Sequence, residues 1–325
     1  MTRVKVRFVA ETASIRIGIS SCLLGQEVRF DGGHKRDRFL TDTLGRFVEW
    51  VPVCPEVEAG FGTPRDPMRL VADGRHIRLI TIKTTADVTD RLERYAGRRV
   101  QELADEQLSG YVLKKDSPSC GMDRVKVYDA HGTPRRSGRG LFAAALRARL
   151  PFLPVEEEGR LSDPGLRDNF IERVFAYRRL LNAFDRRWTL AGLVRFHTAH
   201  KLTLMAHAIP AYRTLGQLVA RAKSLPRAEV RERYTAGFMT ALEALATRRR
   251  HTNVLQHMAG YFKTIDEGSR AELRSTIEDY RRGLVPLIVP ITLLRDYVRR
   301  HGVAYLAGQV YLEPHPKELM LRNHV

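Results

Sequence analysis

Apolar residues in the first half of the chain follow two alternating patterns. Short apolar or alternating runs that end at turn residues are typical of strands, and longer stretches with apolar residues every three or four positions are typical of helices. Strands are predicted at 15–20, just before Cys54, at 76–84, from 108 into the turn at Ser117, and at 151–161; helices are predicted at 87–107 and 138–150. Because strands that alternate with helices indicate a mainly parallel sheet, we expect an α/β domain here.

The pattern changes near residue 163, after which almost the whole chain has helical spacing. Amphipathic stretches are found at 163–184, 189–207, 210–223, 227–247, 252–264, 269–282 and 290–301. Prolines at 210, 226, 286 and 290 lie where helices would begin or break. We therefore predict two domains, an α/β domain over residues 1–160 and an all-α domain over residues 161–325.

Composition and charge narrow the class of protein. No apolar run reaches the ~18 residues that a membrane span needs, and the first residues lack the apolar core of a signal peptide. We therefore expect a cytoplasmic protein that does not bind a membrane. The net charge is +18, with +12 in residues 161–325 and +6 in residues 1–160. This excess suits a polyanionic partner such as nucleic acid; an arginine-rich surface without a partner would have the same composition.

The sequence contains three cysteines, and each follows closely on a strand-like run. Cys22 ends "IRIGISSC", Cys54 ends "VPVC", and Cys120 closes the turn "DSPSC". Since ligands bind at the carboxyl ends of strands in doubly wound sheets, we expect the three thiols to converge. Three thiolates leave one position of a zinc ion, or one iron of a [4Fe-4S] cluster, open for a substrate. The spacing does not choose between these metals, and free cysteines are also common as small buried apolar residues.

Two polar residues accompany the thiols and are candidate catalytic groups. Glu56 lies two positions after Cys54, and Ser117 lies three before Cys120. A carboxylate beside a Lewis-acidic metal can act as general base on water, and a hydroxyl can transfer a proton. The plainer interpretations are that Glu56 is a charge at a helix N-terminus and that Ser117 only forms a turn.

The helical half carries candidate RNA contacts. His197 and Lys201 lie four positions apart on a predicted helix, and Arg248, Arg249 and Arg250 form a basic cluster. We predict that these five residues contact the phosphate and ribose groups of RNA. Core histidines, or a histidine pair that binds a metal, are the alternatives.

Three cysteine motifs resemble those of the thiouracil desulfidase (TudS-type) family. They are "SSCLLGQEVRFDGGHK", "PVCPEVEAGFGTPRDPMRL" and "VLKKDSPSCGMDRVKVY", in this order, and the resemblance covers roughly residues 14–155. The helical half resembles the domain fused to this module in RudS-type enzymes, which are tRNA 4-thiouridine desulfidases. Its matching stretches are "VRFHTAHKLTLMAH", "HTNVLQHMAGYFK", "YRRGLVPLIVPITLLRDYV" and "YLEPHPKELMLRNHV".

The resemblance implies a [4Fe-4S] cluster held by Cys22, Cys54 and Cys120, with the fourth iron open to the thiocarbonyl sulfur of the substrate. It further implies that Glu56 activates the attacking water and that Ser117 assists proton transfer. The expected enzyme is a non-redox desulfidase that converts 4-thiouridine in tRNA to uridine and releases hydrosulfide. A desulfidase of free 4-thiouracil or thionucleosides, and a non-catalytic RNA-binding protein with a structural metal site, are the alternatives.

Overall fold

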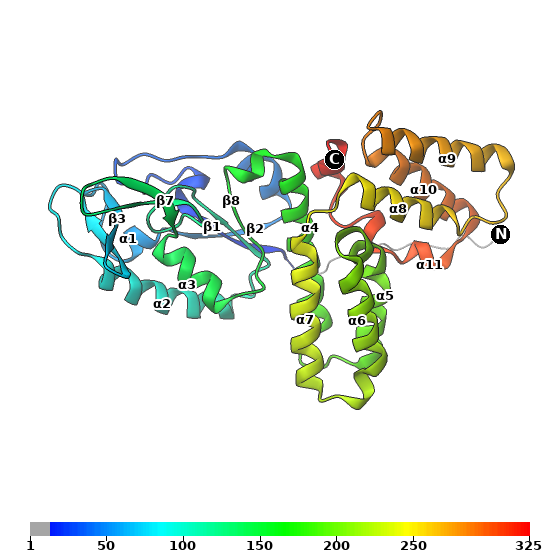
Figure 1. Cartoon of the computed structure of the whole chain (residues 1–325), viewed down its shortest axis with the longest axis horizontal. Coiled ribbons are helices and arrows are strands. Elements are labelled where there is room, and N and C mark those ends of the chain that lie inside the picture. The colour runs from blue at the N-terminus through cyan, green and yellow to red at the C-terminus, as the bar shows by residue number, and fades with distance from the viewer. Residues whose placement is uncertain (1–13) are drawn as a thin grey trace. The chain divides into compact units, whose positions relative to one another are not determined.

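The computed structural model describes residues 14–325, which form two compact units, Ser14–Ser162 and Asp163–Val325 (Figure 1). The predicted boundary at 160/161 lies two residues from this division. The first unit contains strands and helices, and the second contains helices joined by short connections.

The first unit is built on a parallel sheet, as the sequence predicts. Its strand order is β2-β1-β5-β8, and every neighbouring pair is parallel. The strands are β1 (Arg16–Ser20), β2 (Glu49–Val53), β5 (Gly110–Leu113) and β8 (Val155–Glu157). The helices of this unit are α1 (Pro55–Glu58), α2 (Thr89–Asp105) and α3 (Leu141–Arg149), and α2 packs against α3.

Close packing at the centre of this sheet depends on a glycine in β1. A Cβ added at Gly18 would lie 2.2 Å from the ring of Tyr111 on β5. Tyr111 itself is fully buried and contacts the ring of Phe142 on α3. The absence of a side chain at position 18 therefore lets β1 and β5 align with their carboxyl ends at one edge.

A second sheet has mixed strand directions, which the hydrophobic pattern did not predict. Its order is β4-β3-β6-β7, with a parallel β3–β6 pair between two antiparallel hairpins. The strands are β3 (Met68–Asp73), β4 (His76–Thr81), β6 (Val125–Tyr128) and β7 (Pro134–Gly138). The prediction of a strand at 76–84 is therefore correct in type, but this strand belongs to a hairpin. The hairpin turns contain Gly74 and Gly132, whose φ angles of +58° and +77° suit glycine.

The helical unit matches the predicted order of helices closely. Its helices are α4 (Pro164–Ala183), α5 (Leu190–His207), α6 (Ile209–Arg221), α7 (Arg227–Glu243), α8 (Arg248–Ala259), α9 (Glu267–Arg282), α10 (Ile288–His301) and α11 (Ala304–Ala307). Local capping explains several starts: the side chains of Asp163, Thr189 and Asp266 each accept a hydrogen bond from a backbone N–H three residues later. Residues from α5, α8, α9 and α10 share one apolar core.

Within residues 14–325, no helix combines the length and the apolar character that a membrane crossing requires.

Candidate functional site

All three cysteines line one cavity of about 670 Å³ in the α/β unit. Cys22 lies in a 3₁₀ turn that directly follows β1, and Cys54 directly follows β2. Cys120 lies in the turn that follows β5. Because β1, β2 and β5 are parallel neighbours, their carboxyl ends meet at the same edge of the sheet. The predicted convergence of the three sequence motifs is thus present in the fold.

The three thiols are free and lie within electrostatic reach of one another. Burial, with a smaller contribution from the nearby Cys54, raises the pKa of Cys22 to about 11. Burial also raises the pKa of Cys54, and it raises the pKa of Cys120 well above the ordinary value. The thiols are therefore neutral at pH 7 by themselves, and deprotonation needs a positively charged partner such as a metal centre.

The donor set is of the kind that holds iron–sulfur clusters. Among residues 14–325, no three His, Cys, Asp or Glu side chains are placed to hold one metal ion. Thiolates around one zinc ion lie about 3.8 Å apart, given its Zn–S bonds of about 2.3 Å. Iron–sulfur clusters are held by cysteine thiolates, each on a different iron. Three soft sulfur donors around one cavity, two of them buried, are consistent with that chemistry.

The loop after β2 holds Cys54 firmly at the cavity. The backbone N–H of Cys54 donates to the Glu58 carboxylate at 2.8 Å, and its thiol lies 3.7 Å from the carbonyl oxygen of Val28. Glu58 in turn accepts a short hydrogen bond from the Tyr95 hydroxyl on α2 and pairs with Arg99 at 3.6 Å. Helix α2 therefore anchors the loop that carries Cys54.

The turn that carries Cys120 is shaped by two serines. The Ser117 hydroxyl accepts backbone N–H bonds from Ser119 at 3.2 Å and from Cys120 at 3.1 Å. The Ser20 hydroxyl at the end of β1 accepts from the backbone N–H of Lys114, and its bond to the Cys120 thiol offsets part of the rise that burial causes in the pKa of Cys120. Ser117 thus stabilises the turn while it lines the cavity, and within residues 14–325 its hydroxyl proton has no acceptor, so it is available to a bound group.

Glu56 lines the same cavity, and both of its carboxylate oxygens are held by side chains that the sequence did not single out. Arg65 donates to Oε2 through Nε at 2.7 Å, with Nη2 at 2.5 Å. The buried Ser119 hydroxyl donates to Oε1 at 2.6 Å. The Arg65 and Glu56 side chains are 6% and 13% exposed. Arg65 belongs to the stretch "TPRDP" of the second cysteine motif, and Ser119 directly precedes Cys120. Their positions inside the cysteine motifs were the features of the sequence that could have marked them as site residues.

The remaining lining of the cavity is partly apolar and partly cationic. Phe30, Met68, Ile82 and Tyr128 supply apolar and aromatic surface, and Lys114 pairs with Glu158 at 2.5 Å. The cavity volume lies within the range of about 300–1,000 Å³ typical of small-molecule sites. A flat heterocyclic base therefore has room beside the thiols and Glu56.

The residues predicted to contact RNA have different environments in the helical unit. His197 is 4% exposed and forms a 3.1 Å contact between Nδ1 and the Tyr234 hydroxyl, so it is a core residue. This exposure leaves little surface for the predicted contact of His197 with RNA, which stays a prediction. Lys201 is half-buried, so its access to RNA stays a prediction.

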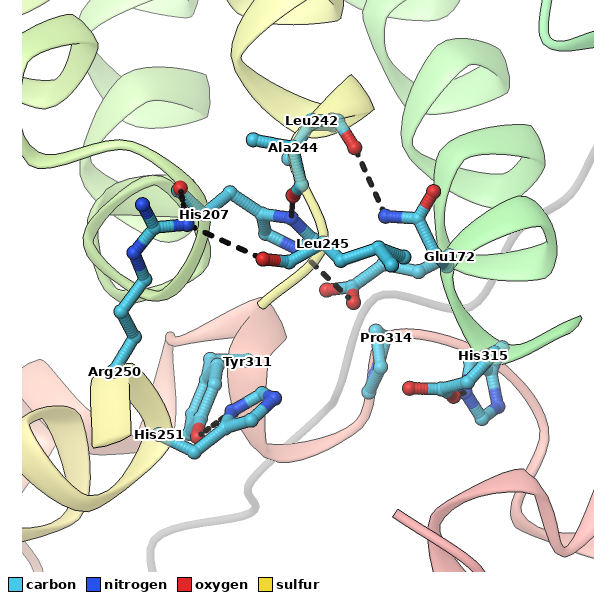
Figure 2. Close-up of polar contacts among 12 residues, drawn as sticks. Glu172, His207, Leu242, Ala244, Leu245, Arg250, His251, Tyr311, Pro314 and His315 are labelled. Atoms are coloured by element: carbon cyan, nitrogen blue, oxygen red, sulfur yellow. Dashed lines mark hydrogen bonds and ion pairs between the residues drawn. The ribbon is translucent and has the colours of Figure 1, made fainter. Parts of the chain in front are cut away.

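The arginine cluster at the start of α8 is mostly occupied by contacts inside the unit. Arg248 donates to the Tyr280 carbonyl at 2.8 Å and covers the Tyr280 ring. Figure 2 shows Arg250 beside His207 and Leu245, whose carbonyl oxygens accept from its Nη1 at 2.8 and 3.2 Å. Arg249 is exposed and pairs with no carboxylate among residues 14–325. Arg248 and Arg250 thus bind backbone carbonyl oxygens, and within residues 14–325 none of the three arginines pairs with a carboxylate, so their contact with RNA stays a prediction.

The carboxyl edge of the parallel sheet thus carries three free cysteines and a held carboxylate around one cavity. The model of the 2-thiouracil desulfurase family matches residues 17–158, and a family of unknown function (DUF1722) matches residues 201–316. YbgA, an uncharacterized protein of Escherichia coli (strain K12), is 34% identical over 158 residues, which cover 48% of this chain and 94% of YbgA. YbbK, an uncharacterized protein of Bacillus subtilis (strain 168), is 31% identical over 138 residues, which cover 40% of this chain and 87% of YbbK.

Among solved structures, the [4Fe-4S]-dependent thiouracil desulfidase TudS is similar at 32% sequence identity. The match covers 46% of this chain and 94% of that one, with a TM-score of 0.39. The chain belongs to the TudS-type thiouracil desulfidase family, as its three cysteine motifs predicted.

Proposed function

We propose that this protein is a [4Fe-4S]-dependent desulfidase that converts 4-thiouridine in tRNA to uridine. The observation that carries the proposal is the single cavity lined by Cys22, Cys54, Cys120 and Glu56. The three thiolates would hold the cluster, and a cluster with one open iron supplies a thiophilic Lewis acid for the thiocarbonyl sulfur.

The chain's own groups would bring water to the carbon that loses sulfur. The Glu56 carboxylate accepts a proton from water, whose oxygen adds to C4 of the base while the carbon–sulfur bond breaks. The products are uridine and hydrosulfide, so the reaction is a hydrolysis and needs no oxidant or reductant. Arg65 and Ser119 hold Glu56 in one orientation, and the free proton of Ser117 is available to the departing sulfur or to the base.

The RNA part of the proposal draws support from charge. The helical half carries a net charge of +12, which an uncharged base would not require. Desulfidation of free 4-thiouracil is the second candidate function, because the matching family model is that of 2-thiouracil desulfurases. A non-catalytic RNA-binding protein has less support, since a structural site has no need of a held carboxylate beside the thiols.

The test begins with anaerobic reconstitution with iron and sulfide, followed by absorption near ~400 nm, where iron–sulfur clusters absorb. The loaded protein is then incubated with 4-thiouridine-containing tRNA and, separately, with 4-thiouracil, and nucleosides and hydrosulfide are measured. We expect uridine from the tRNA in an amount equal to the hydrosulfide released. Single Cys→Ser variants should lose both absorption and turnover. Cluster loading without loss of sulfur from either substrate would refute the proposal, and turnover of 4-thiouracil alone would favour the second candidate.

A further inference from the structure

One end of the helical unit concentrates cations that have no carboxylate partners. The connection 184–189 joins α4 to α5, and the connection 222–226 joins α6 to α7 (Figure 1). Arg227 links the two connections, because its guanidinium donates to the Trp188 carbonyl and lies 4.5 Å from the centre of the Trp188 ring. We call these two connections, with Arg221 and Arg227 at the adjoining helix ends, the basic tip.

The charge of the basic tip is strongly one-sided. Its exposed cations are Arg186, Arg187, Arg221, Lys223 and Arg227. Within residues 14–325, none of these five forms an ion pair with a carboxylate. Asp185 is the one carboxylate in the basic tip, and it accepts a hydrogen bond from the backbone N–H of Arg187 at 2.8 Å. Glu229, one turn into α7, is already paired with Arg233 at 2.7 Å.

Several surface arginines on α9 and α10 are neutralised by carboxylates of the same helix. Arg281 pairs with Glu278 at 2.6 Å, and Arg299 and Arg300 pair with Asp296 at 3.3 and 2.6 Å, whereas the exposed Arg282 forms no ion pair within residues 14–325. The basic tip differs in that five such cations lie together on two adjoining connections with one carboxylate among them. This concentration suits a partner that supplies the counterions.

The charge of the basic tip comes from its side chains. Helices α5 and α7 begin at the tip and α4 and α6 end there, so the positive and negative ends of their dipoles offset one another. The residue that precedes α7 is Pro226, which supplies no side-chain cap. The Trp188 ring, packed against Phe184 at 5.0 Å, gives Arg227 a rigid support.

We propose that the basic tip binds the phosphate backbone of RNA. Arginine forks match phosphate oxygens, and several unpaired cations on neighbouring loops suit a polyanion more than a single small anion. None of the exposed large apolar side chains among residues 14–325 lies in either connection, which disfavours insertion into a lipid surface. The choice of RNA rests on the proposed function, and the location rests on the charges described here.

The test measures binding of the full-length chain to unmodified tRNA, so that it does not depend on the desulfidase reaction. The tip variant carries Arg186→Glu, Arg187→Glu and Lys223→Glu. The matched control carries Arg281→Glu, Arg299→Glu and Arg300→Glu, with the same change of net charge. Fluorescence anisotropy over 50–300 mM salt gives the dissociation constant and its salt slope. Circular dichroism confirms that each variant is folded, and single Arg186→Gln, Arg187→Gln and Lys223→Gln variants replace the triple variant if it does not fold.

We expect the tip variant to bind tRNA at least about 30-fold more weakly, with a log–log salt slope shallower by about 2 to 3, because about 0.7–0.9 is lost per phosphate contact. Each single Gln variant should lower the slope by about one such contact. The control should stay within about threefold of the parent, because its arginines are already neutralised by carboxylates. Equal losses in both triple variants, or unchanged binding in the tip variant, would overturn the assignment. Tip-dependent binding to phosphatidylserine vesicles with unchanged binding to tRNA would also overturn it. Tip-dependent binding of tRNA whose 4-thiouridine is never desulfidated would leave the basic tip in place and refute the proposed function.

Discussion

The pairing of Glu56 with Arg65 predicts a large and partner-specific loss of stability when the arginine is removed. Arg65→Met leaves the 13%-exposed Glu56 carboxylate without two charge-assisted bonds, at 2.5 and 2.7 Å. It also removes the donors to the carbonyl oxygens of Val28 and Gly62. Removing one member of a buried ion pair typically costs about 3–5 kcal/mol, because the other charge stays buried without a partner. We expect a loss of this size in the α/β unit.

The assay is urea denaturation of the metal-free protein, so that loss of a bound group does not enter the free energy. The chain has two tryptophans, Trp50 on β2 and Trp188 in the helical unit. A Trp188→Phe background therefore makes fluorescence report on the α/β unit alone. The control is Arg36→Met, whose 2.6 Å pair with Asp42 is 52% and 48% exposed. An exposed pair contributes at most about 1 kcal/mol, so the control should change little.

A double-mutant cycle separates the pair from other effects of the arginine. Glu56→Gln alone leaves Arg65 buried and unpaired, whereas Glu56→Gln in the Arg65→Met background removes a charge that already lacks its partner. The second step should therefore cost far less than the first, with a coupling free energy of at least about 2 kcal/mol. Additivity within about 0.5 kcal/mol, or an Arg65→Met cost below 1 kcal/mol, would show that the ion pair does not stabilise the site.

Three further outcomes follow from the structure. Glu56→Gln should keep the absorption of the reconstituted cluster but lower turnover by about 10²–10⁴-fold, and Ser117→Ala should lower turnover less. The control is Glu49→Gln at an exposed position. Full activity of the Glu56→Gln variant would contradict the role of Glu56 as general base. Gly140→Ala should destabilise the α/β unit by about 1–3 kcal/mol and impair cluster loading. The reason is that the added Cβ would lie 2.4 Å from the Ser119 carbonyl oxygen and 2.8 Å from the Cys120 nitrogen. Normal cluster loading and stability would show that the turn adapts. Burial lowers the pKa of His197 to about 4 and those of His200 and His251 to about 3. The unfolded chain therefore binds more protons than the folded one below about pH 6.5. As the pH falls from 6.5 toward 4, each of these histidines should lower the free energy of unfolding of the helical unit by up to about 1.4 kcal/mol per pH unit. Urea titrations of a Trp50→Phe chain at pH 7, 6 and 5 measure this free energy of unfolding. His197→Gln should weaken its dependence on pH. An unchanged free energy of unfolding over this range would contradict the prediction.

The sequence by itself determined the order of the elements and the positions of the cysteines. The helices of the second half were readable because their spacing and their caps, such as Asp163, Thr189 and Asp266, are local properties of the chain. The convergence of Cys22, Cys54 and Cys120 was predictable because parallel strands end at a common edge. Long-range pairing was different, and the mixed second sheet was missed because its strands meet through turns that the hydrophobic pattern does not mark.

Only the tertiary structure decided which side chains surround each candidate group. Ser119 lies sixty-three positions from Glu56 in the chain, yet its hydroxyl holds the Glu56 carboxylate at 2.6 Å. Arg248 and Arg250 looked like a free basic cluster, but Nη1 of each donates to carbonyl oxygens of the same unit. Five exposed cations without a carboxylate partner within residues 14–325 lie together on two other connections, which Arg227 and Trp188 bring together. A charge is free or neutralised according to its neighbours in space, and those neighbours come from distant parts of the sequence.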